Sequence, residues 1–588
     1  MRYHALAADY DGTLAHHGVI EEATWAALRK LRESGRKLVM VTGRELDELL
    51  AILQSDVEIF DRIVAENGAL IYQPSTKQIR TLAEPPPTAF IDELRRRGVD
   101  RVAAGRVIVA TWEPHEDTVF HAIHELGLEL QVLFNKGAVM VLPTGVNKAT
   151  GLQAALRELG LSPHNVVAIG DAENDHCLLA ACECAVAVAN ALPVLKDKAD
   201  VLTRSPHGQG VSELITHILR DDLAAAAPRL TRHQVLIGHG DGGEVCVDPY
   251  AANILVCGTS GSGKSTLATG ILERLGAAGY QFAILDPEGD FTELEDAVVL
   301  GGPQRVPLIE EIVDVLRDPS DNLVINMLGV ALEHRPEFFV KLMPALADLR
   351  TRTGRPHWLV VDEAHHLLPA SWGPAAEGIA LRPHGTIYLT VHPGSVAMAV
   401  LELVDTVVAV GAHPDQTIRE LCEAAGLVAP APCNIDKLPP GSVLHWRVGT
   451  REAQVVRTEL PKGERTRHSR KYTEGNLGHD RSFYFKGPDG KLNLKAHNLQ
   501  LFLHIADGID DETWLFHLRR GDYSTWLRTE VKDAALADEV VRVERAALDA
   551  KQGRLAIRDA VEKRYTLPSD KPSGIIDPVV PALKASVG

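Results

Sequence analysis

Short apolar runs alternate with amphipathic stretches through the first 221 residues. Buried strands are predicted over Ala5–Ala8, Lys37–Val41 and Asn165–Ile169, and each run is followed by polar or charged residues. Strands that alternate with helices predict a parallel α/β sheet. Because the carboxyl ends of parallel strands meet at one edge of the sheet, we expect a functional site at that edge.

The region from about 83 to 143 has a different pattern and is predicted to be an inserted α+β cap over that site. Pro85–Pro87 marks its entry. A helix (88–98), a strand (101–112), a second helix (115–127) and two strands (128–143) are predicted in this order. Caps can select the substrate. Arg44 and the cap histidines are candidates for substrate contact, with a solvent-facing charge as the default interpretation.

A second α/β domain is predicted over residues 234–460, after an alanine-rich linker at 222–233. It begins with a β-hairpin at 235–244 that has a glycine-rich turn. Buried strands are then predicted at 254–257, 281–285, 358–361 and 386–390.

The C-terminal region, 461–588, is rich in aromatic residues between 481 and 530. Trp514 and Leu518 have helical spacing, which favours a small helical core over a surface on which nucleic-acid bases stack. A charged helix is predicted over 539–564, and the tail after Pro568 is expected to be irregular. The basic run 462–471 is either a phosphate contact or a solvated linker.

Composition sets limits on the class of protein. A chain of 588 residues is long enough for three or four domains. The net charge of −18 argues against a protein that coats DNA, although a local basic channel is compatible with it. Seven scattered cysteines suggest a reducing compartment. The sequence shows no apolar run of membrane-spanning length and no signal peptide, so we expect a cytoplasmic protein without membrane contact.

The central motif runs from Gly258 to Thr266 and has the form G-x-x-x-x-G-K-S. A strand precedes it and a helical pattern follows, which is the context that a phosphate-binding loop requires. Backbone N–H groups of the loop would surround the phosphates of ATP, Lys264 would contact the β- and γ-phosphates, and Ser265 would bind Mg²⁺. The predicted nucleotide-binding residues of the loop are Gly258, Gly261, Ser262, Gly263, Lys264, Ser265 and Thr266.

A second nucleotide motif follows the apolar strand 358–361. Asp362 and Glu363 have the Walker B arrangement, in which Asp362 holds Mg²⁺ and Glu363 orients the attacking water. The glutamate favours hydrolysis of ATP over transfer of the phosphoryl group to another acceptor.

Acidic residues and a lysine follow the strands of the first domain. Asp9 and Asp11 come after the first strand, Thr42 after the second, Lys148 opens a helix, and Asp171 begins the segment that contains Asn174 and Asp175. This order resembles the haloacid dehalogenase (HAD) superfamily, and the Val64–Ala69 run is similar to its Cof-type (IIB-like) sugar-phosphatase branch. The resemblance covers residues 1–221 and implies a Rossmann-like domain with a cap at about 83–143.

The HAD resemblance implies a role for each of these residues. Asp9 is the nucleophile that forms an aspartyl-phosphate, and Asp11 is the acid and then the base. Thr42 and Lys148 hold the phosphoryl oxygens. The implied Mg²⁺ ligands are Asp171, the Asp9 carboxylate and the Asp11 carbonyl, with Asn174 and Asp175 completing or supporting the set. A catalytically inactive HAD scaffold is the alternative.

The segment 234–460 resembles the HerA/FtsK group of ring-forming, RecA-like ATPases. The hairpin before the P-loop, the Asp286–Phe291 turn and the Asp362-Glu-Ala-His365 run carry this resemblance. It implies a homo-hexameric ring with ATP at subunit interfaces, and Arg382 is a candidate for an arginine supplied in trans. His392 stands where members commonly carry glutamine, so it either senses the γ-phosphate or caps a strand.

Three functional interpretations remain open. The favoured one is a Mg²⁺-dependent HAD phosphatase fused to a HerA-like ATPase ring, with ATP and a phosphorylated substrate as ligands. The second is a DNA-translocating or DNA-processing ATPase in which the HAD domain removes terminal phosphates or serves as a scaffold. The third is a metabolic sugar-phosphate phosphatase regulated by ATP, with no nucleic acid.

Overall fold

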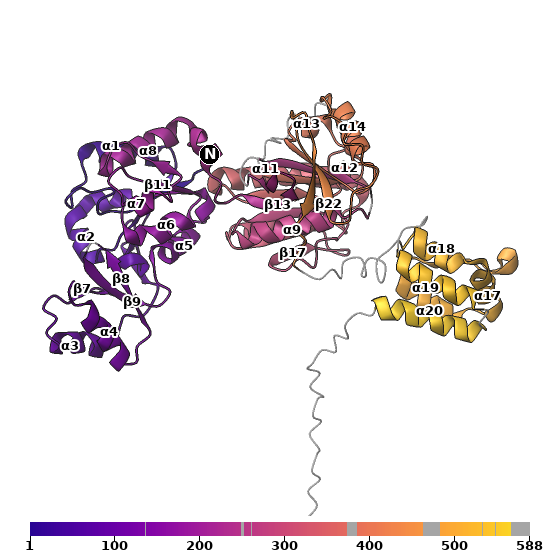
Figure 1. The fold of residues 1–588 in the computed structure, drawn as a ribbon, viewed down its shortest axis with the longest axis horizontal. Coiled ribbons are helices and arrows are strands. Elements are labelled where there is room, and N and C mark those ends of the chain that lie inside the picture. The colour runs from indigo at the N-terminus through magenta and orange to yellow at the C-terminus, as the bar shows by residue number, and fades with distance from the viewer. Residues whose placement is uncertain are drawn as a thin grey trace, which may run out of the picture. The chain divides into compact units, whose positions relative to one another are not determined.

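The protein is described by a computed structural model that covers residues 1–135, 137–248, 252–259, 261–372, 385–462, 482–531, 533–546 and 549–565. Residues 1–462 form one compact unit, and the residues from 463 onward belong to a second. Figure 1 shows two α/β parts in the first unit and a mainly helical second unit. Among the described helices, none is long and apolar enough to cross a bilayer.

The first domain is built on an eight-stranded sheet with the order β12-β11-β10-β1-β2-β3-β4-β5. The strands from β12 to β3 are parallel, and β4 and β5 are antiparallel additions. All residues of β1 and β10 are buried, as expected for central strands covered on both faces. The strands are β1 (Ala5–Ala8), β2 (Lys37–Val41), β3 (Arg62–Ala65), β4 (Leu70–Gln73), β5 (Gln78–Thr81), β10 (Val166–Gly170), β11 (Cys184–Ala187) and β12 (Val201–Leu202). The helices are α1 (Glu22–Glu33), α2 (Leu46–Leu53), α5 (Lys148–Glu158), α6 (His176–Ala181), α7 (Pro193–Lys196) and α8 (His207–Asp221).

The cap has a four-stranded sheet, β6-β7-β9-β8, and two helices. In Figure 1, α3 and α4 cover one face of this sheet, and the other face packs toward the first domain. The elements are α3 (Thr88–Arg96), β6 (Ala103–Ala104), β7 (Val109–Trp112), α4 (Glu116–Glu125), β8 (Leu130–Asn135) and β9 (Ala138–Pro143).

The single strand predicted over 101–112 is wrong, because the chain turns between β6 and β7. The N–H group of Gly105 donates to the carbonyl of Ile108 (2.9 Å), which closes the turn. The next N–H groups donate to the carboxylate of Glu66 instead of to a neighbouring strand.

The central domain has an eleven-stranded sheet with the order β14-β13-β23-β22-β21-β15-β20-β19-β16-β18-β17. The part from β21 to β17 is parallel, and β20 separates the P-loop strand β15 from β19. The parallel strands are β15 (Asn253–Gly258), β16 (Phe282–Asp286), β17 (Ala297–Gly301), β18 (Asn322–Asn326), β19 (Trp358–Val361), β20 (Thr386–Thr390) and β21 (Thr406–Val410). The antiparallel strands are β13 (Val235–Gly240), β14 (Gly243–Val247), β22 (Ser442–Arg447) and β23 (Gln454–Thr458). The helices are α9 (Lys264–Ala277), α10 (Ile309–Leu316), α11 (Arg335–Thr353), α12 (Ala364–Leu367), α13 (Met398–Leu401) and α14 (Pro414–Ala425).

The C-terminal unit combines a short hairpin with five helices in its described part. Its aromatic residues form the core, with Phe485, Phe502, Trp514, Tyr523 and Trp526 all buried. These rings are therefore not exposed for stacking on bases. The elements are β24 (Phe483–Phe485), β25 (Leu494–Ala496), α16 (Leu499–Gly508), α17 (Asp511–Arg520), α18 (Asp522–Thr529), α19 (Ala534–Arg545) and α20 (Ala550–Tyr565).

The single charged helix predicted over 539–564 is also wrong. The structure has α19 and α20 instead, and Asp549 starts the second helix by accepting the N–H group of Gln552 (2.7 Å).

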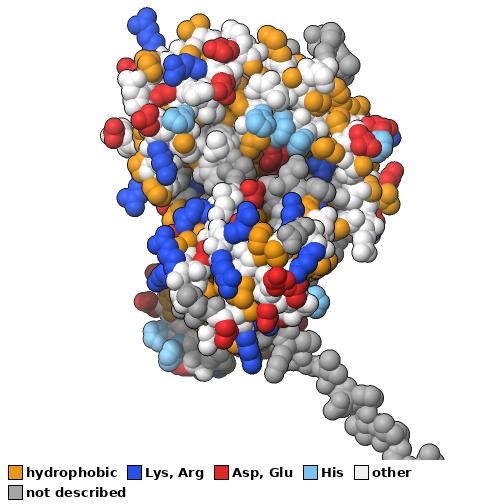
Figure 2. All heavy atoms as spheres, turned by 90° about the vertical axis from the view of Figure 1, so that its right-hand side faces the viewer, with side chains coloured by type: hydrophobic (Ala, Val, Ile, Leu, Met, Phe, Trp, Pro, Cys, Tyr) orange, Lys and Arg blue, Asp and Glu red, His pale blue; other side chains and the backbone are white. Residues whose placement is uncertain are grey.

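On the face of the molecule drawn in Figure 2, Lys and Arg side chains lie among Asp and Glu side chains. The basic run from 463 to 471 and the tail lie outside the described residues.

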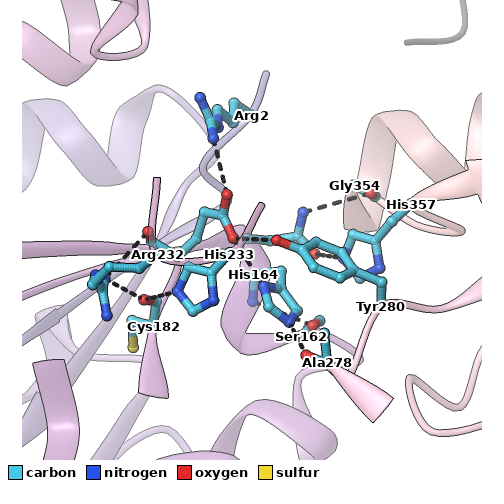
Figure 3. A network of polar contacts seen from close by, with 12 residues as sticks. Arg2, Ser162, His164, Cys182, Arg232, His233, Ala278, Tyr280, Gly354 and His357 are labelled. Atoms are coloured by element: carbon cyan, nitrogen blue, oxygen red, sulfur yellow. Dashed lines mark hydrogen bonds and ion pairs between the residues drawn. The ribbon is translucent and has the colours of Figure 1, made fainter. Parts of the chain in front are cut away.

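A buried polar joint connects the first and central domains, and Figure 3 shows Arg2, His164 and Tyr280 in it. The buried carboxylate of Glu183 lies at its centre. The carboxylate accepts hydrogen bonds from Arg2 (2.9 Å), His164 (2.8 Å) and Tyr280 (2.8 Å). The second ring nitrogen of His164 lies 2.8 Å from the carbonyl oxygen of Ala278. The rings of His164 and Tyr280 stack at 3.6 Å. Both domains therefore contribute to one network.

Arg355 extends this joint from the central domain. Its side chain is fully buried and donates to the carbonyl of Gly160 in the first domain (2.6 Å). It also donates to the Gln281 side chain (2.7 Å). His357 lies 3.2 Å from the Asn165 side chain and accepts the N–H group of Gln281. Buried polar networks of this kind favour one relative arrangement of the groups that they join.

The joint lies at the amino ends of the strands. Asn165, Gln281 and His357 directly precede β10, β16 and β19. The residues predicted to be functional follow the carboxyl ends of these strands, so each sheet separates its candidate site from the joint.

Acid titration of Glu183 is expected to weaken the fold. Burial acts to raise the pKa of Glu183, but the hydrogen bond and charge of His164 and the charge of Arg2 outweigh it and lower the pKa to about 2. The unfolded chain binds this proton more readily than the folded chain does. The charged carboxylate of Glu183 therefore adds about 3 kcal/mol to the free energy of unfolding above pH ~4.5, and this contribution is lost as the pH falls toward ~2. Glu183→Gln should lower the free energy of unfolding by a similar amount at pH 7, as measured by urea unfolding.

The matched control is Glu33→Gln on the exposed surface of α1. It should follow the wild type at pH 7 and across the acid range. Equal stability of wild type and Glu183→Gln at pH 7 would contradict the assigned contribution.

Candidate active sites

The first site lies at the carboxyl ends of β1, β2 and β10. Asp9 follows β1 and Asp171 follows β10, and the carboxylate oxygens of Asp9, Asp171 and Asp175 lie within 4.8 Å of one another. Lys148, the first residue of α5, donates to Asp9 (2.6 Å) and to Asp175 (2.5 Å). All four side chains are buried. The structure thus brings together residues from both ends of the first domain.

Negative charge exceeds positive charge in this cluster. Burial and the charge of Asp175 raise the pKa of Asp9 above its usual range, despite the contact with Lys148. The pKa of Lys148 is also raised, because the charges of Asp175 and Asp9 outweigh the effect of burial. One ammonium group therefore faces three carboxylates, which makes the site favourable for a divalent cation.

The remaining donors also fit a hard cation such as Mg²⁺. The side-chain oxygen of Asn174 is buried without a hydrogen-bond partner, while its amide nitrogen donates to Asn67 (3.2 Å). Asp175 has one oxygen on Lys148 and the other on the N–H groups of Asp171 and Ala172, so it supports the site through hydrogen bonds. Carboxylate and amide oxygens are the ligands that Mg²⁺ prefers. Asp9, Asp171 and Asn174 would hold the ion.

Gly12 allows the chain to pass close to this cluster. Its φ is +89°, and a Cβ atom there would lie 2.3 Å from a carboxylate oxygen of Asp171. Thr42 lies at the end of β2, where its hydroxyl accepts the N–H group of Arg44 (3.1 Å).

The P-loop follows β15 and leads into α9. A Cβ atom at Gly258 would lie 2.1 Å from the carbonyl oxygen of Val410, so the strand end accepts only glycine. Lys264 donates from its ammonium group to the carbonyls of Gly258 (2.9 Å) and Thr259 (3.1 Å), which places the charge inside the loop. Burial lowers the pKa of Lys264, against the attraction of Glu363 and Asp362. Gly261, Ser262, Gly263 and Thr266 lie in the same loop and first helical turn.

Several carboxylates lie around the Mg²⁺ position predicted at Ser265. Asp290 lies 3.4 Å from the Ser265 hydroxyl. Burial, followed by the charges of Asp286 and Glu363, raises the pKa of Asp362 well above its usual range. Burial raises the pKa of Asp286 to about 6, against the hydrogen bonds that it accepts from Asp290 and Phe291. This excess of buried negative charge also fits a divalent cation.

Glu363 lies beside a cluster of three histidines, His365, His366 and His392. His365 contacts the Thr390 hydroxyl (3.1 Å) and lies 3.4 Å from Glu363. The rings of His365 and His392 are 5.6 Å apart, and the N–H group of His392 donates to Thr390 (3.1 Å). The side chain of His392 therefore lies near His365 of the Walker B region, and the residue directly follows β20. Arg382 lies outside the described residues.

Comparison with known proteins identifies the first domain. Residues 6–100 and 107–215 match the haloacid dehalogenase-like hydrolases. Phosphoglycolate phosphatase 2 of Saccharolobus solfataricus is 31% identical over 222 residues, covering 36% of this chain and 91% of that protein. Phosphoglycolate phosphatase of Methanothermobacter thermautotrophicus is 30% identical over 233 residues, covering 37% and 98%.

The chain belongs to the haloacid dehalogenase-like hydrolases. A haloacid dehalogenase-like hydrolase of Bacteroides thetaiotaomicron has a solved structure that is 21% identical, with a TM-score of 0.32, covering 37% of this chain and 99% of that one. Residues 248–381 match the AAA domain. The protein is therefore an enzyme in which a HAD phosphatase domain is fused to an AAA-type P-loop ATPase domain.

Arg44, which the sequence offered as a candidate for substrate contact, binds Asp11 in the first site. Its guanidinium donates to both carboxylate oxygens of Asp11 (2.6 and 2.8 Å) and to Glu48 (2.5 Å). The Tyr10 ring lies 5.4 Å from the guanidinium carbon. The default interpretation of Arg44 as a solvent-facing charge is wrong. Only its position directly after Thr42 and Gly43 signalled this in the sequence.

Asp290 is a second residue whose position the sequence left open. The sequence indicates the Asp286–Phe291 turn, but the contact between Asp290 and Ser265 depends on β16 and β15 belonging to one sheet.

Loss of Arg44 should impair the phosphatase by releasing Asp11. We expect Arg44→Ala to lower kcat for p-nitrophenyl phosphate roughly 10- to 100-fold, because small misplacements of catalytic groups have effects of this size. Arg44→Lys should recover only part of the activity, since a lysine cannot form the bidentate contact. Steady-state kinetics measure both effects.

Arg29→Ala, an exposed arginine of α1, is the control and should keep the wild-type kcat. A wild-type kcat in Arg44→Ala would exclude a role for Arg44 in placing Asp11.

Proposed function

We propose that the protein is a Mg²⁺-dependent bifunctional phosphohydrolase, in which a HAD phosphomonoesterase is joined to a ring-forming, HerA-like ATPase. The observation that carries the proposal is the buried cluster of Asp9, Asp171 and Asp175 around Lys148. The second acidic cluster at the P-loop supports the ATPase part.

In the proposed phosphatase reaction, the Asp9 carboxylate attacks phosphorus and forms an aspartyl-phosphate. Asp11 protonates the leaving oxygen and then takes a proton from the water that hydrolyses the intermediate. Lys148 and Thr42 bind the phosphoryl oxygens, which offsets the repulsion between the nucleophile and its anionic substrate. Mg²⁺, when bound, supplies further charge neutralisation.

In the proposed ATPase reaction, Lys264 and the loop N–H groups bind the phosphates, and Glu363 orients the attacking water. Ser265 and Asp362 would hold Mg²⁺. His392 is a candidate sensor of the γ-phosphate, because it lies beside His365 and Glu363.

A second candidate function is a metabolic phosphatase controlled by ATP. The two relatives described above are named for a small-molecule phosphatase activity, which favours a small phosphomonoester as the substrate. DNA processing is the remaining alternative, and DNA-stimulated ATP hydrolysis would favour it.

The two activities should be separable by mutation. We expect Asp9→Asn to abolish hydrolysis of p-nitrophenyl phosphate and to leave ATP hydrolysis within twofold of wild type. Lys264→Ala should have the reverse effect, because the joint lies at the opposite ends of the strands from both sites. Malachite-green assays of each substrate measure this, and loss of both activities in either variant would show that the sites depend on each other.

The proposed ring predicts a change in mass. Light scattering of the full chain with a non-hydrolysable ATP analogue should give about six times the monomer mass of 63.8 kDa. Monomers with and without the analogue would argue against a ring and leave the phosphatase proposal intact.

A further inference from the structure

Three consecutive residues between β3 and β4 of the HAD core have a left-handed backbone. These are Glu66, Asn67 and Gly68, with φ of 50°, 56° and 103°, and they form the short helix η2. Glu66 and Asn67 are each only 1% exposed. Non-glycine residues adopt this conformation at an energetic cost, and they keep it where the surroundings determine it.

The backbone and amide group of this segment contact the catalytic side of the HAD domain. The N–H group of Asn67 donates to the carbonyl of Thr42 (2.9 Å), and that of Glu66 to the carbonyl of Arg44 (2.9 Å). The Asn67 side chain accepts from Asn174 (3.2 Å).

Gly68 brings the same segment against the start of α5. A Cβ atom on Gly68 would lie 1.9 Å from the carbonyl oxygen of Asn147 and 3.0 Å from the backbone nitrogen of Lys148. The segment 66–68 therefore touches the chain at Thr42, at Lys148 and at Asn174.

The carboxylate of Glu66 faces the other way, toward the cap. It accepts the N–H groups of Arg106 (2.9 Å), Val107 (2.7 Å) and Ile108 (3.0 Å), just before β7 begins. A Cβ atom on Gly105 would lie 2.8 Å from this carboxylate, so the turn packs closely around it. Hydrogen bonds from N–H groups to a charged carboxylate are stronger than those to a neutral acceptor.

The cap sheet that begins at this turn reaches the catalytic residues. Ile108 packs with Met140 and Leu142 of β9 and with Ala69 of the core. The sulfur of Met140 lies 3.8 Å from where a Cβ atom on Gly43 would be. Gly43 lies between Thr42 and Arg44. The position of the turn at 105–108 thus sets where the cap surface lies over the site.

We propose that Glu66 is a positioning residue that fixes the cap over the HAD site, so that the leaving group of the phosphomonoester is held by the cap while the core binds the phosphoryl group. This inference rests on the proposed phosphatase function. It predicts that Glu66 governs binding of the whole substrate but not of inorganic phosphate, which contacts only the core.

The test is Glu66→Gln in the full chain. The amide keeps the size of the side chain, but its NH2 group, a donor, replaces one oxygen that accepts from the backbone N–H groups of residues 106–108. We expect the KM for p-nitrophenyl phosphate to rise at least tenfold, with kcat within threefold of wild type. The inhibition constant of inorganic phosphate should stay within twofold. An unchanged KM, or phosphate inhibition that weakens as much as KM rises, would overturn the proposal.

Gly105→Ala is a second variant that leaves Glu66 in place. Its added Cβ would displace the turn from the carboxylate, so KM should rise here too while phosphate inhibition is retained. The matched control, Glu33→Gln, should match the wild type in both constants.

Hydrogen exchange separates a failure of this inference from a failure of the proposed function. In the wild type the amides of 106–108 should exchange slowly, and Glu66→Gln should speed their exchange at least tenfold while the amides of β1 keep their protection. A wild type that hydrolyses no phosphomonoester refutes the proposed function, and the exchange rates still decide whether Glu66 holds the cap. Equal exchange at 106–108 in both proteins overturns the inference.

Discussion

Buried carboxylates held close together are the constraint on which both candidate sites depend. Desolvation and mutual repulsion disfavour such groups, and the raised pKa values of Asp9 and Asp362 are the consequence. The sheets hold these residues in place because their strands are buried on both faces, and the acidic residues follow directly where the strands end. Lys148 and Lys264 offset part of the charge. The negative charge that the two lysines leave uncompensated explains why a divalent cation suits both sites.

The joint around Glu183 also contains a buried carboxylate, but here the pKa of the carboxylate is lowered and not raised. This carboxylate accepts hydrogen bonds from Arg2, His164 and Tyr280. Burial acts to raise its pKa, but the hydrogen bond and charge of His164 and the charge of Arg2 outweigh burial and lower it. Charge and hydrogen bonds are satisfied within the protein, which suits a structural contact between two domains. Because this contact uses the amino ends of the strands, the carboxyl ends of both sheets stay available for chemistry.

The HAD domain shows how its cap and its core are connected. Arg44 and Glu66 are both charged residues that bind within the protein, one to Asp11 and one to three backbone N–H groups of the cap. The left-handed segment that contains Glu66 also contacts Thr42 and Asn174. Cap position and catalytic geometry thus share one small, strained element, whose conformation persists because it is held from several sides.

The sequence alone predicted the two α/β architectures and the candidate residues of both sites, because strand ends, glycine loops and acidic residues are local patterns. The strands Ala5–Ala8, Lys37–Val41, Trp358–Val361 and Thr386–Thr390 have the bounds that apolar runs predicted. Local patterns failed at 101–112 and 539–564, where a turn and a capping aspartate interrupt a regular pattern. Only the tertiary structure decided that Arg44 binds Asp11, that Asp290 reaches Ser265, and that His164 and Tyr280 meet at Glu183. These contacts join residues from different strands, loops or domains, and their distances depend on how the sheets pack, which no local pattern encodes.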